Sequence, residues 1–447
     1  MAAAEPLSAW ARDASRDFLF AGHVWDRSSG VLRLDYRLDQ QPLSERFCFP
    51  LPNNGRIPPE PALERAFSLL HWVAGVSYWK AGCPQRVAFA GSAPNAEQAD
   101  WLNVLYREGL AEFAWHNRLP PDRFAVFRGE RSTAAAAGPA GLDDACLVPL
   151  GGGKDSLVAW SRLERRGLNL TSVQVGSSAL IRAVAASAGG PHLVIERRLD
   201  PRLAELNAGG AWNGHVPITA INAAALVVLA LLHGFGQVVF ANERSADEAT
   251  LFDEQGRPVN HQFAKSLAFE RMLDHWVRSW IASDLRVFSL LRRDRELAIC
   301  REFAGLGQFH AVFSSCNRNF HLDGPRTERW CGQCPKCHFV FLGLAPFMNR
   351  SDLARIFGAD LLARPELLPG FRALLALDGR KPFECVGEAA EARAAIRALA
   401  EGSEWRAAPI VRTLNDELAG FEVPGLDELC RPGGQHLIPP SLLHAPG

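Results

Sequence analysis

The stretch ACLVPLGGGKDS, residues 145–156, decides the fold of this chain. Ala145–Leu150 is a continuous apolar run, which predicts a strand buried on both faces. After three glycines, apolar residues recur at three-residue spacing from Leu157 to Leu163 and Gly167 follows, which predicts a helix that ends there. Glycines let the backbone turn sharply and point N–H groups into one concavity, and a helix start adds partial positive charge. The stretch therefore predicts a strand, loop and helix that bind phosphate.

Two common phosphate-binding loops do not match Gly151–Ser156. A Walker A loop needs Ser or Thr directly after its lysine, where Asp155 stands, and a dinucleotide fingerprint needs a third glycine where Ser156 stands. The segment instead resembles the SGGxDS loop of the ATP pyrophosphatase family, often called the PP-loop, with Gly151 in place of the first serine. The resemblance implies that ATP is cleaved between its α and β phosphates and that the loop holds the pyrophosphate. An ordinary glycine-rich turn is the structural alternative.

The charges in the loop suggest how it would bind nucleotide. Lys154 would offset phosphate charge, and Asp155 would act through Mg²⁺, because a bare carboxylate repels phosphate. The family's fold places adenine near the end of the second strand, here at Gly176. ATP and Mg²⁺ are therefore the expected cofactors. The residues expected to bind them are Gly151, Gly152, Gly153, Lys154, Asp155, Ser156 and Gly176.

Strand and helix patterns alternate beyond the loop. Apolar runs at 170–175, 192–195, 237–241 and 286–291 are separated by helical patterns, which predicts a parallel sheet covered on both faces. With the resemblance, the expected fold is α/β: a parallel-sheet PP-loop ATP pyrophosphatase core, similar to the adenine nucleotide alpha hydrolases, with an α+β N-terminal domain and a helical C-terminal region. The expected domains are 1–140, 141–345 and 346–447, with an Ala- and Gly-rich linker at 131–141.

Four of the ten cysteines lie close together near the end of the expected ATP-binding domain: Cys316, Cys331, Cys334 and Cys337. Short spacings let turns present several sulfurs to one ion, so a tetrahedral Zn²⁺ site is the simplest interpretation. An iron–sulfur cluster uses similar ligands, and spacing alone does not exclude it. His338 is an alternative to Cys316 as a ligand. A site with four thiolates has no open position, which predicts a structural role.

Composition narrows the class of protein. The 447 residues carry 48 Lys+Arg against 49 Asp+Glu, a net charge of −1, which argues against a nucleic-acid binder. The most apolar stretch, Val216–Leu232, is short for a membrane span and carries Pro217, Thr219 and Asn222, which predicts a buried helix. With no signal peptide at the N-terminus, the chain is expected to be cytoplasmic and not membrane-bound. Its oligomeric state is not indicated.

Three polar segments narrow the substrate: Trp212–Thr219, Ala241–Ser245 and Lys381–Glu388. Together with the loop, the cysteines and the length, they resemble the ATP-dependent UDP-N-acetylmuramoyl-L-alanyl-L-glutamate epimerases of bacterial peptidoglycan synthesis. The resemblance covers most of the chain. It implies that the terminal L-Glu of a UDP-MurNAc dipeptide is inverted to D-Glu while ATP is converted to AMP and pyrophosphate.

The chemistry explains why such a reaction would consume ATP. The α-proton of a glutamate carboxylate is hard to remove, whereas the carbonyl of a neutral acyl adenylate can accept the enolate charge. An inversion suits two proton carriers on opposite faces. Candidates by residue type are His215, whose ordinary pKa lies near neutrality, then Glu243 and Lys265. Lys265 could equally bind a phosphate group. The predicted catalytic residues are therefore His215, Glu243, Lys265 and Asp155.

Two other functions remain open at this point. One is another PP-loop synthetase or an RNA-modifying enzyme that adenylates its substrate, such as the 7-cyano-7-deazaguanine synthases, some of which share a Cys-rich element. The other is a nucleotide-binding module without chemistry, against which the intact Lys154-Asp155-Ser156 argues only weakly.

Overall fold

The structure is a computed structural model that describes residues 15–53, 55–120, 123–124, 126–130, 136–320 and 328–443. The chain divides into two compact units, each assembled from separate segments. Unit 1 comprises Met1–Asp143, Val194–Gly236 and Met272–Arg286; unit 2 comprises Asp144–Leu193, Gln237–Arg271 and Val287–Gly447. The three contiguous domains expected from the sequence stay a prediction, and part of the expected linker, 131–135, lies outside the described residues.

Unit 1 is built on a mixed sheet. Its strands are β1 (Asp17–Asp26), β2 (Val31–Leu38), β3 (Gln41–Cys48), β4 (Arg86–Phe89) and β7 (His192–Arg198), in the order β7-β3-β2-β1-β4. β1, β2, β3 and β7 pair in antiparallel fashion, whereas β4 is parallel to β1. Every second residue of β2 is buried, as expected for a strand with one face on the core.

The helices of unit 1 are α1 (Glu60–Ala74), α2 (Val76–Trp79), α3 (Ala96–Glu108), α4 (Ala111–Asn117), α7 (Arg202–Ala208) and α8 (Ile218–His233); α9 (Leu267–Trp276) begins in unit 2. The apolar stretch predicted to be a buried helix is α8, twelve of whose residues are buried and which packs on α1. No helix of the described residues has the length and apolar character to span a membrane. α3 ends with Gly109 as its C-cap, and α4 begins two residues later.

Unit 2 has α/β character at the predicted position. Its strands β5 (Asp143–Pro149), β6 (Leu170–Val175), β8 (Phe235–Phe240) and β11 (Arg286–Ser289) follow the order β11-β8-β5-β6, and β5 and β6 are parallel. A short hairpin of β9 (Leu251–Phe252) and β10 (Pro258–Val259) follows β8. The helices α5 (Lys154–Glu164) and α6 (Ala179–Ala188) follow β5 and β6. The strands expected from continuous apolar runs are confirmed, with ends that move by a few residues.

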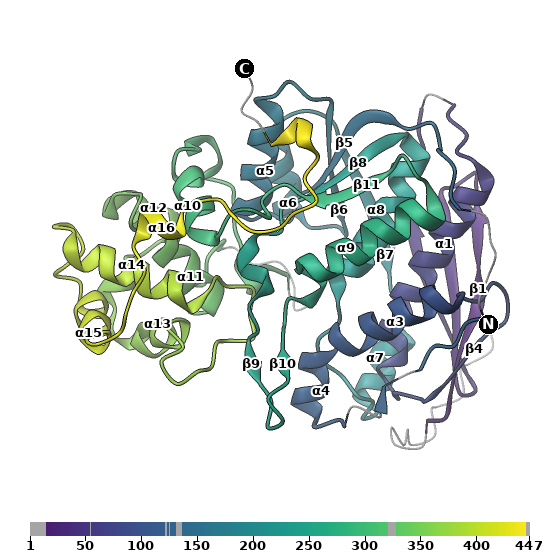
Figure 1. Ribbon diagram of the computed structural model, residues 1–447, viewed down its shortest axis with the longest axis horizontal. Coiled ribbons are helices and arrows are strands. Elements are labelled where there is room, and N and C mark those ends of the chain that lie inside the picture. Colours follow the sequence, from purple (N-terminus) through teal and green to yellow (C-terminus); the bar gives the residue numbers. More distant parts are fainter. Residues whose placement is uncertain are drawn as a thin grey trace. The chain divides into compact units, whose positions relative to one another are not determined.

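The C-terminal part of unit 2 is helical, as predicted. It contains α10 (Glu296–Ala304), α11 (Pro335–Leu344), α12 (Arg350–Phe357), α13 (Leu368–Leu374), α14 (Ala389–Glu401), α15 (Pro409–Glu417) and α16 (Leu426–Leu429), which Figure 1 shows in green to yellow. α11 packs on α10, α13 and α14. The core formed by these helices is continuous with the residues of α5 and β5. The loop after β5 is therefore fixed to a large core.

Candidate functional site

The glycine loop joins β5 to α5 in a conformation that needs glycine. Gly152 has a φ of +85°, and a Cβ there would lie 2.4 Å from a methyl carbon of Leu180. A Cβ on Gly153 would lie 2.5 Å from the hydroxyl of Ser315. Gly153 is the N-cap of α5 and offers no side-chain cap, so no N-cap side chain takes up the first N–H groups of the helix. The predicted strand, loop and helix are confirmed, and the helix start can receive an anion.

Lys154 is buried directly behind this loop. Only 2% of its side chain is exposed, and its ammonium donates hydrogen bonds to Asp155 and to Glu296 at the start of α10. Burial opposes the charge on Lys154, but the two carboxylates outweigh it and raise its pKa well above the ordinary value. Lys154 is therefore a permanent cation that joins α5 to α10.

Glu243 and Lys265 are held at the same site through their backbones. The guanidinium of buried Arg292 donates to the carbonyl of Glu243 at 2.7 Å and to the carbonyl of Lys265 at 2.6 Å. Its charge is compensated by Glu270, 2.9 Å away. Arg292 thus fixes two of the predicted catalytic residues beside the loop without using their side chains.

Three carboxylates meet at this point. Oxygens of Asp155, Glu243 and Glu296 lie within 4.8 Å of one another. Burial and the charge of Asp155 raise the pKa of Glu296 to about 7, and the same two causes raise the pKa of Glu243. In the described residues no other side chain donates a hydrogen bond to the Glu243 carboxylate, which is 5% exposed. A set of oxygen donors with surplus negative charge fits a hard divalent cation such as Mg²⁺.

Cys385 faces the cationic side of the site. His261 and Lys265 both form hydrogen bonds with its sulfur, and Lys336 at the start of α11 adds positive charge. Lys265 also interacts with Glu243 and Asp155. Cys385 therefore lies at the edge of the carboxylate cluster, and in the sequence it looked like one more small buried residue.

The four predicted metal-binding cysteines come together, all within 4.8 Å. The sulfur–sulfur distances are 3.9 Å for Cys316–Cys334, 3.7 Å for Cys331–Cys337 and 3.5 Å for Cys334–Cys337. Sulfurs at about 2.3 Å from a tetrahedral Zn²⁺ lie about 3.8 Å apart, so the geometry fits that ion. His338 is not in the group, because its Nε2 bonds the Gly332 carbonyl at 3.2 Å. The choice between zinc and an iron–sulfur cluster stays a prediction.

The cysteine group is tied to the phosphate loop. The Ser314 amide donates to the Gly152 carbonyl at 2.9 Å, and the Ser314 hydroxyl accepts from the Cys316 amide at 3.1 Å. The same hydroxyl donates to the Arg329 carbonyl at 2.6 Å. We call the segment Ser314–Cys316 the strap. A metal that fixes Cys316 would thereby also fix the strap, which supports the loop at Gly152.

The remaining predicted residues lie as follows. Gly176 directly follows β6, has a φ of +97°, and its carbonyl accepts a hydrogen bond from the Gln174 side chain at 2.7 Å. A Cβ at this position would meet nothing within 4 Å. The Ser156 hydroxyl donates to the Gly153 carbonyl at 3.2 Å. His215 belongs to unit 1, where its Nδ1 lies 3.3 Å from a carboxylate oxygen of Glu112. The open space at Gly176 suits the predicted adenine contact, and the role of His215 stays a prediction.

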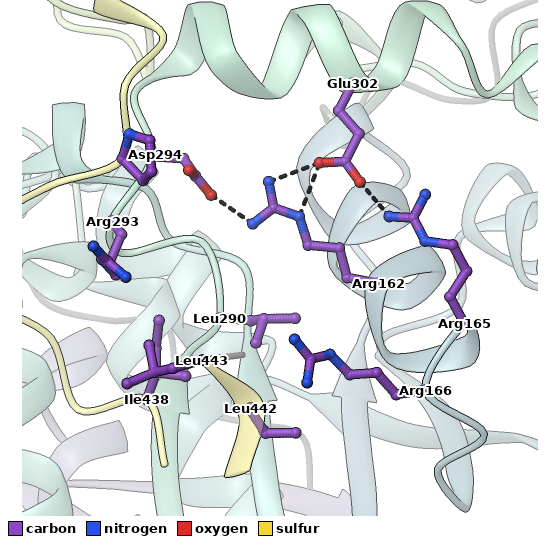
Figure 2. Close-up of a pocket in the computed structure, with 11 residues that line it drawn as sticks. Arg162, Arg165, Arg166, Leu290, Arg293, Asp294, Glu302, Ile438, Leu442 and Leu443 are labelled. Carbon is purple, nitrogen blue, oxygen red and sulfur yellow. Dashed lines mark hydrogen bonds and ion pairs between the residues drawn. The ribbon is translucent and has the colours of Figure 1, made fainter. Parts of the chain in front are cut away.

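Unit 2 also has a cavity of about 400 Å³ beside α5. Figure 2 shows its ion pairs: Arg162 reaches both Asp294 and Glu302, and Arg165 reaches Glu302. Two further arginines, Arg166 and Arg293, also line the cavity, and the rest of the wall is apolar: Leu290, Pro432, Ile438, Leu442 and Leu443. The cations and anions in these pairs balance, unlike those at the loop.

Sequence analysis missed several groups of the site. Glu296 and Arg292 lie just beyond the end of β11, in the run LLRRDREL, which has charges directly after a buried strand. That position is the signal that could have found them, because ligands bind at the carboxyl ends of strands in open α/β sheets. Cys385 lay inside a segment that was singled out, but its cationic neighbours come from other segments and leave no local signal.

Comparison with known proteins gives a consistent result. Residues 9–290 match the MurL N-terminal domain family, and residues 312–427 match the MurL C-terminal domain family. A protein of Xanthomonas oryzae pv. oryzae named UDP-N-acetyl-alpha-D-muramoyl-L-alanyl-L-glutamate epimerase is 44% identical over 442 residues, which is 98% of each chain. A Salinispora tropica protein of the same name is 41% identical over 94% of this chain and 93% of its own length. A third protein of this name, from a Micromonospora strain, is 41% identical over 95% of this chain and 96% of its own length.

Proposed function

This chain belongs to the MurL family, and from that premise we propose that it inverts the terminal L-glutamate of UDP-N-acetyl-alpha-D-muramoyl-L-alanyl-L-glutamate in peptidoglycan precursor synthesis. The observation that carries the proposal is the near full-length identity of 41–44% to three proteins named as this epimerase. The loop with its carboxylate cluster supports the further proposal that the reaction begins with adenylation of the glutamate by ATP.

The residues of the loop would divide the work on ATP. The first N–H groups of α5 would bind the leaving pyrophosphate, since they form a fixed cradle of donors. Lys154 keeps its positive charge at neutral pH and offsets the phosphate charge. Gly176 leaves open space at the end of β6 for the adenine, as in the PP-loop fold that the sequence resembles.

We propose that Asp155, Glu243 and Glu296 hold Mg²⁺ when the nucleotide binds. The ion would supply charge neutralisation for the departing pyrophosphate. Sequence analysis assigned Glu243 to proton transfer, and that role stays a prediction. A ligand role is supported by its carboxylate lying with two others and receiving no hydrogen bond from another side chain of the described part.

The four cysteines would hold a structural Zn²⁺. No open coordination position would remain for catalysis. Because Ser314 bonds both Cys316 and Gly152, a metal held by the cysteines would also hold the phosphate loop in place.

The test is incubation of the protein with ATP, Mg²⁺ and UDP-MurNAc-L-Ala-L-Glu, followed by chromatography of the nucleotides and chiral analysis of the glutamate. We expect AMP, pyrophosphate and D-Glu. AMP without D-Glu would keep the adenylation proposal and overturn the epimerase, in favour of another adenylating synthetase. ADP and inorganic phosphate in place of AMP would overturn cleavage between the α and β phosphates.

A further inference from the structure

Cys385 has surroundings that the roles given above do not use. It lies in the segment Lys381–Glu388, which is held at Lys381 by Glu248 and by the Gly387 carbonyl at 3.2 Å. The residue is partly exposed, and its sulfur forms hydrogen bonds with both His261 and Lys265. A structural cysteine in a protein core behaves as a small apolar residue and needs no such cations.

A second group beside it also points to a ligand. Glu243 is 5% exposed, and its carboxylate accepts a hydrogen bond from the backbone but, in the described residues, none from another side chain. Lys265 interacts with Glu243 as well as with Cys385. One lysine therefore connects the sulfur to the carboxylate cluster at the phosphate loop.

We propose that Cys385 is a proton carrier of the epimerisation, its thiolate removing the α-proton of the activated glutamate. This inference rests on the proposed function, because it needs an acyl adenylate as substrate. His261 and Lys265 would hold the sulfur as a thiolate and orient it. Thiolates, unlike thiols, act as bases and nucleophiles at neutral pH.

The step balances without a further reagent. The S–H bond forms as the Cα–H bond breaks, and the electron pair of that bond passes to the adenylate carbonyl as an enolate. The enolate takes a proton on its opposite face from a second acid or from water, which gives the inverted centre. The thiol then loses its proton to solvent, and hydrolysis of the mixed anhydride releases AMP.

The electrostatics of the site agree with this role. Burial opposes ionisation of Cys385, but Lys265, Lys336 and His261 outweigh it and hold the pKa of the thiol well below its ordinary value. By contrast, burial raises the pKa of Cys430, another cysteine of unit 2.

The first test separates the two halves of the reaction. We expect Cys385→Ser to lower D-Glu formation about 100-fold or more, since a positioned base contributes roughly 10²–10⁴. Substrate-dependent exchange of labelled pyrophosphate into ATP should stay within about threefold of wild type. The matched control, Cys430→Ala, should keep both activities. Epimerisation by Cys385→Ser at near the wild-type rate, or parallel loss of both activities, would overturn the proposal.

A second test uses the unmodified chain. Iodoacetamide at pH 7 should alkylate Cys385 at least tenfold faster than Cys48, which is also partly exposed, with the sites identified by peptide mass spectrometry. Alkylation should abolish D-Glu formation and the exchange of the α-proton with D₂O while pyrophosphate exchange persists. Equal alkylation rates for the two cysteines would overturn the proposal. If wild-type protein forms AMP but no D-Glu, the proposed function itself fails.

Discussion

Two sets of ion pairs join α5 to the segment around α10, and they differ in burial and in charge. At the start of α5, Lys154 is 2% exposed and pairs with Asp155 and Glu296, beside Glu243. Two turns later, Arg162 is 27% exposed and pairs with Asp294 and Glu302. Burial and Asp155 raise the pKa of Glu296 to about 7, whereas the arginines outweigh burial and lower the pKa of Glu302.

The difference separates a binding site from a structural contact. The pairs of Arg162 with Asp294 and Glu302 are balanced in charge once Arg165 is included, and they are partly exposed. Such a set needs no additional ion, and its contribution to stability is small. Even beside Lys154 and Lys265, the carboxylates of Asp155, Glu243 and Glu296 repel one another, and two of these residues are buried, which costs free energy that a well-packed apolar contact would not cost. Such an arrangement is typical of functional sites, where a cation or substrate completes the charge balance. The predictions below alter one set while the other serves as reference.

The largest effect is expected for Lys154→Met. Removing one partner of a buried ion pair costs about 3–5 kcal/mol. That cost falls on the free energy of unfolding; separately, loss of a charge that stabilises the departing pyrophosphate should lower AMP formation by roughly 10²–10³-fold. The readout is AMP released from ATP with the UDP-dipeptide present, with circular dichroism to verify the fold. Lys80→Met, which removes a buried lysine bound to Asn213 in unit 1, is the control and should form AMP within about threefold of wild type. AMP formation by Lys154→Met within tenfold of wild type would contradict the assignment.

Glu243→Gln tests the proposed Mg²⁺ site. Wild-type protein is expected to melt at a higher temperature when Mg²⁺ is added, because an ion that binds only the native state stabilises it. The variant should lose this increase and form AMP about 100-fold more slowly. Glu248→Gln, whose partner is Lys381, should keep the Mg²⁺ effect. If Glu243→Gln forms AMP normally but makes no D-Glu, the proton-carrier role predicted from the sequence holds instead.

Disruption of the cysteine group should act on the loop through the strap at Ser314. We expect elemental analysis to find about one zinc per chain in wild type and none in Cys334→Ala. The variant should melt at least about 5 °C lower and form AMP roughly tenfold more slowly, since Ser314 no longer holds Gly152 in place. Cys430→Ala removes a buried cysteine outside the group and should keep its zinc. If iron is found in place of zinc, the identity of the metal changes, but loss of the metal should still lower AMP formation through Ser314.

Local patterns made part of this site predictable. The glycine loop, the strand before it and the four cysteines each form a short motif, and the structure confirms the loop geometry and the meeting of the sulfurs. The resemblance to the epimerase family is confirmed by the MurL domain matches and the relatives, whereas the resemblance to the PP-loop family stays a prediction. These features depend on neighbours within a few residues along the chain.

Long-range partners were not predictable. Glu296 lies 142 positions from the lysine that it pairs with, and only the fold brings the two together. Arg292 acts through the carbonyls of Glu243 and Lys265, which no side-chain pattern encodes. His215 was chosen by residue type alone, and its Nδ1 lies 3.3 Å from a carboxylate oxygen of Glu112 in unit 1. The charge balance that distinguishes the two sets of ion pairs is likewise a property of the folded chain.

The smallest effect is expected for Arg162→Met, which breaks the balanced set. Arg162 and Glu302 are partly exposed but Asp294 is buried, so we expect a loss of about 1–3 kcal/mol in the free energy of unfolding at pH 7, and AMP formation unchanged. The folded-state pKa of Glu302 lies below its ordinary value, so its stabilising contribution is present above that value and disappears as the pH falls through the lowered pKa. The difference between wild type and variant should therefore vanish in acid. Urea unfolding at pH 7 and near pH 3 measures it, with Arg166→Met, whose arginine donates to the Ser441 carbonyl at 3.3 Å, as control. A loss of AMP formation in Arg162→Met as large as that in Lys154→Met would contradict the distinction between a binding site and a structural contact.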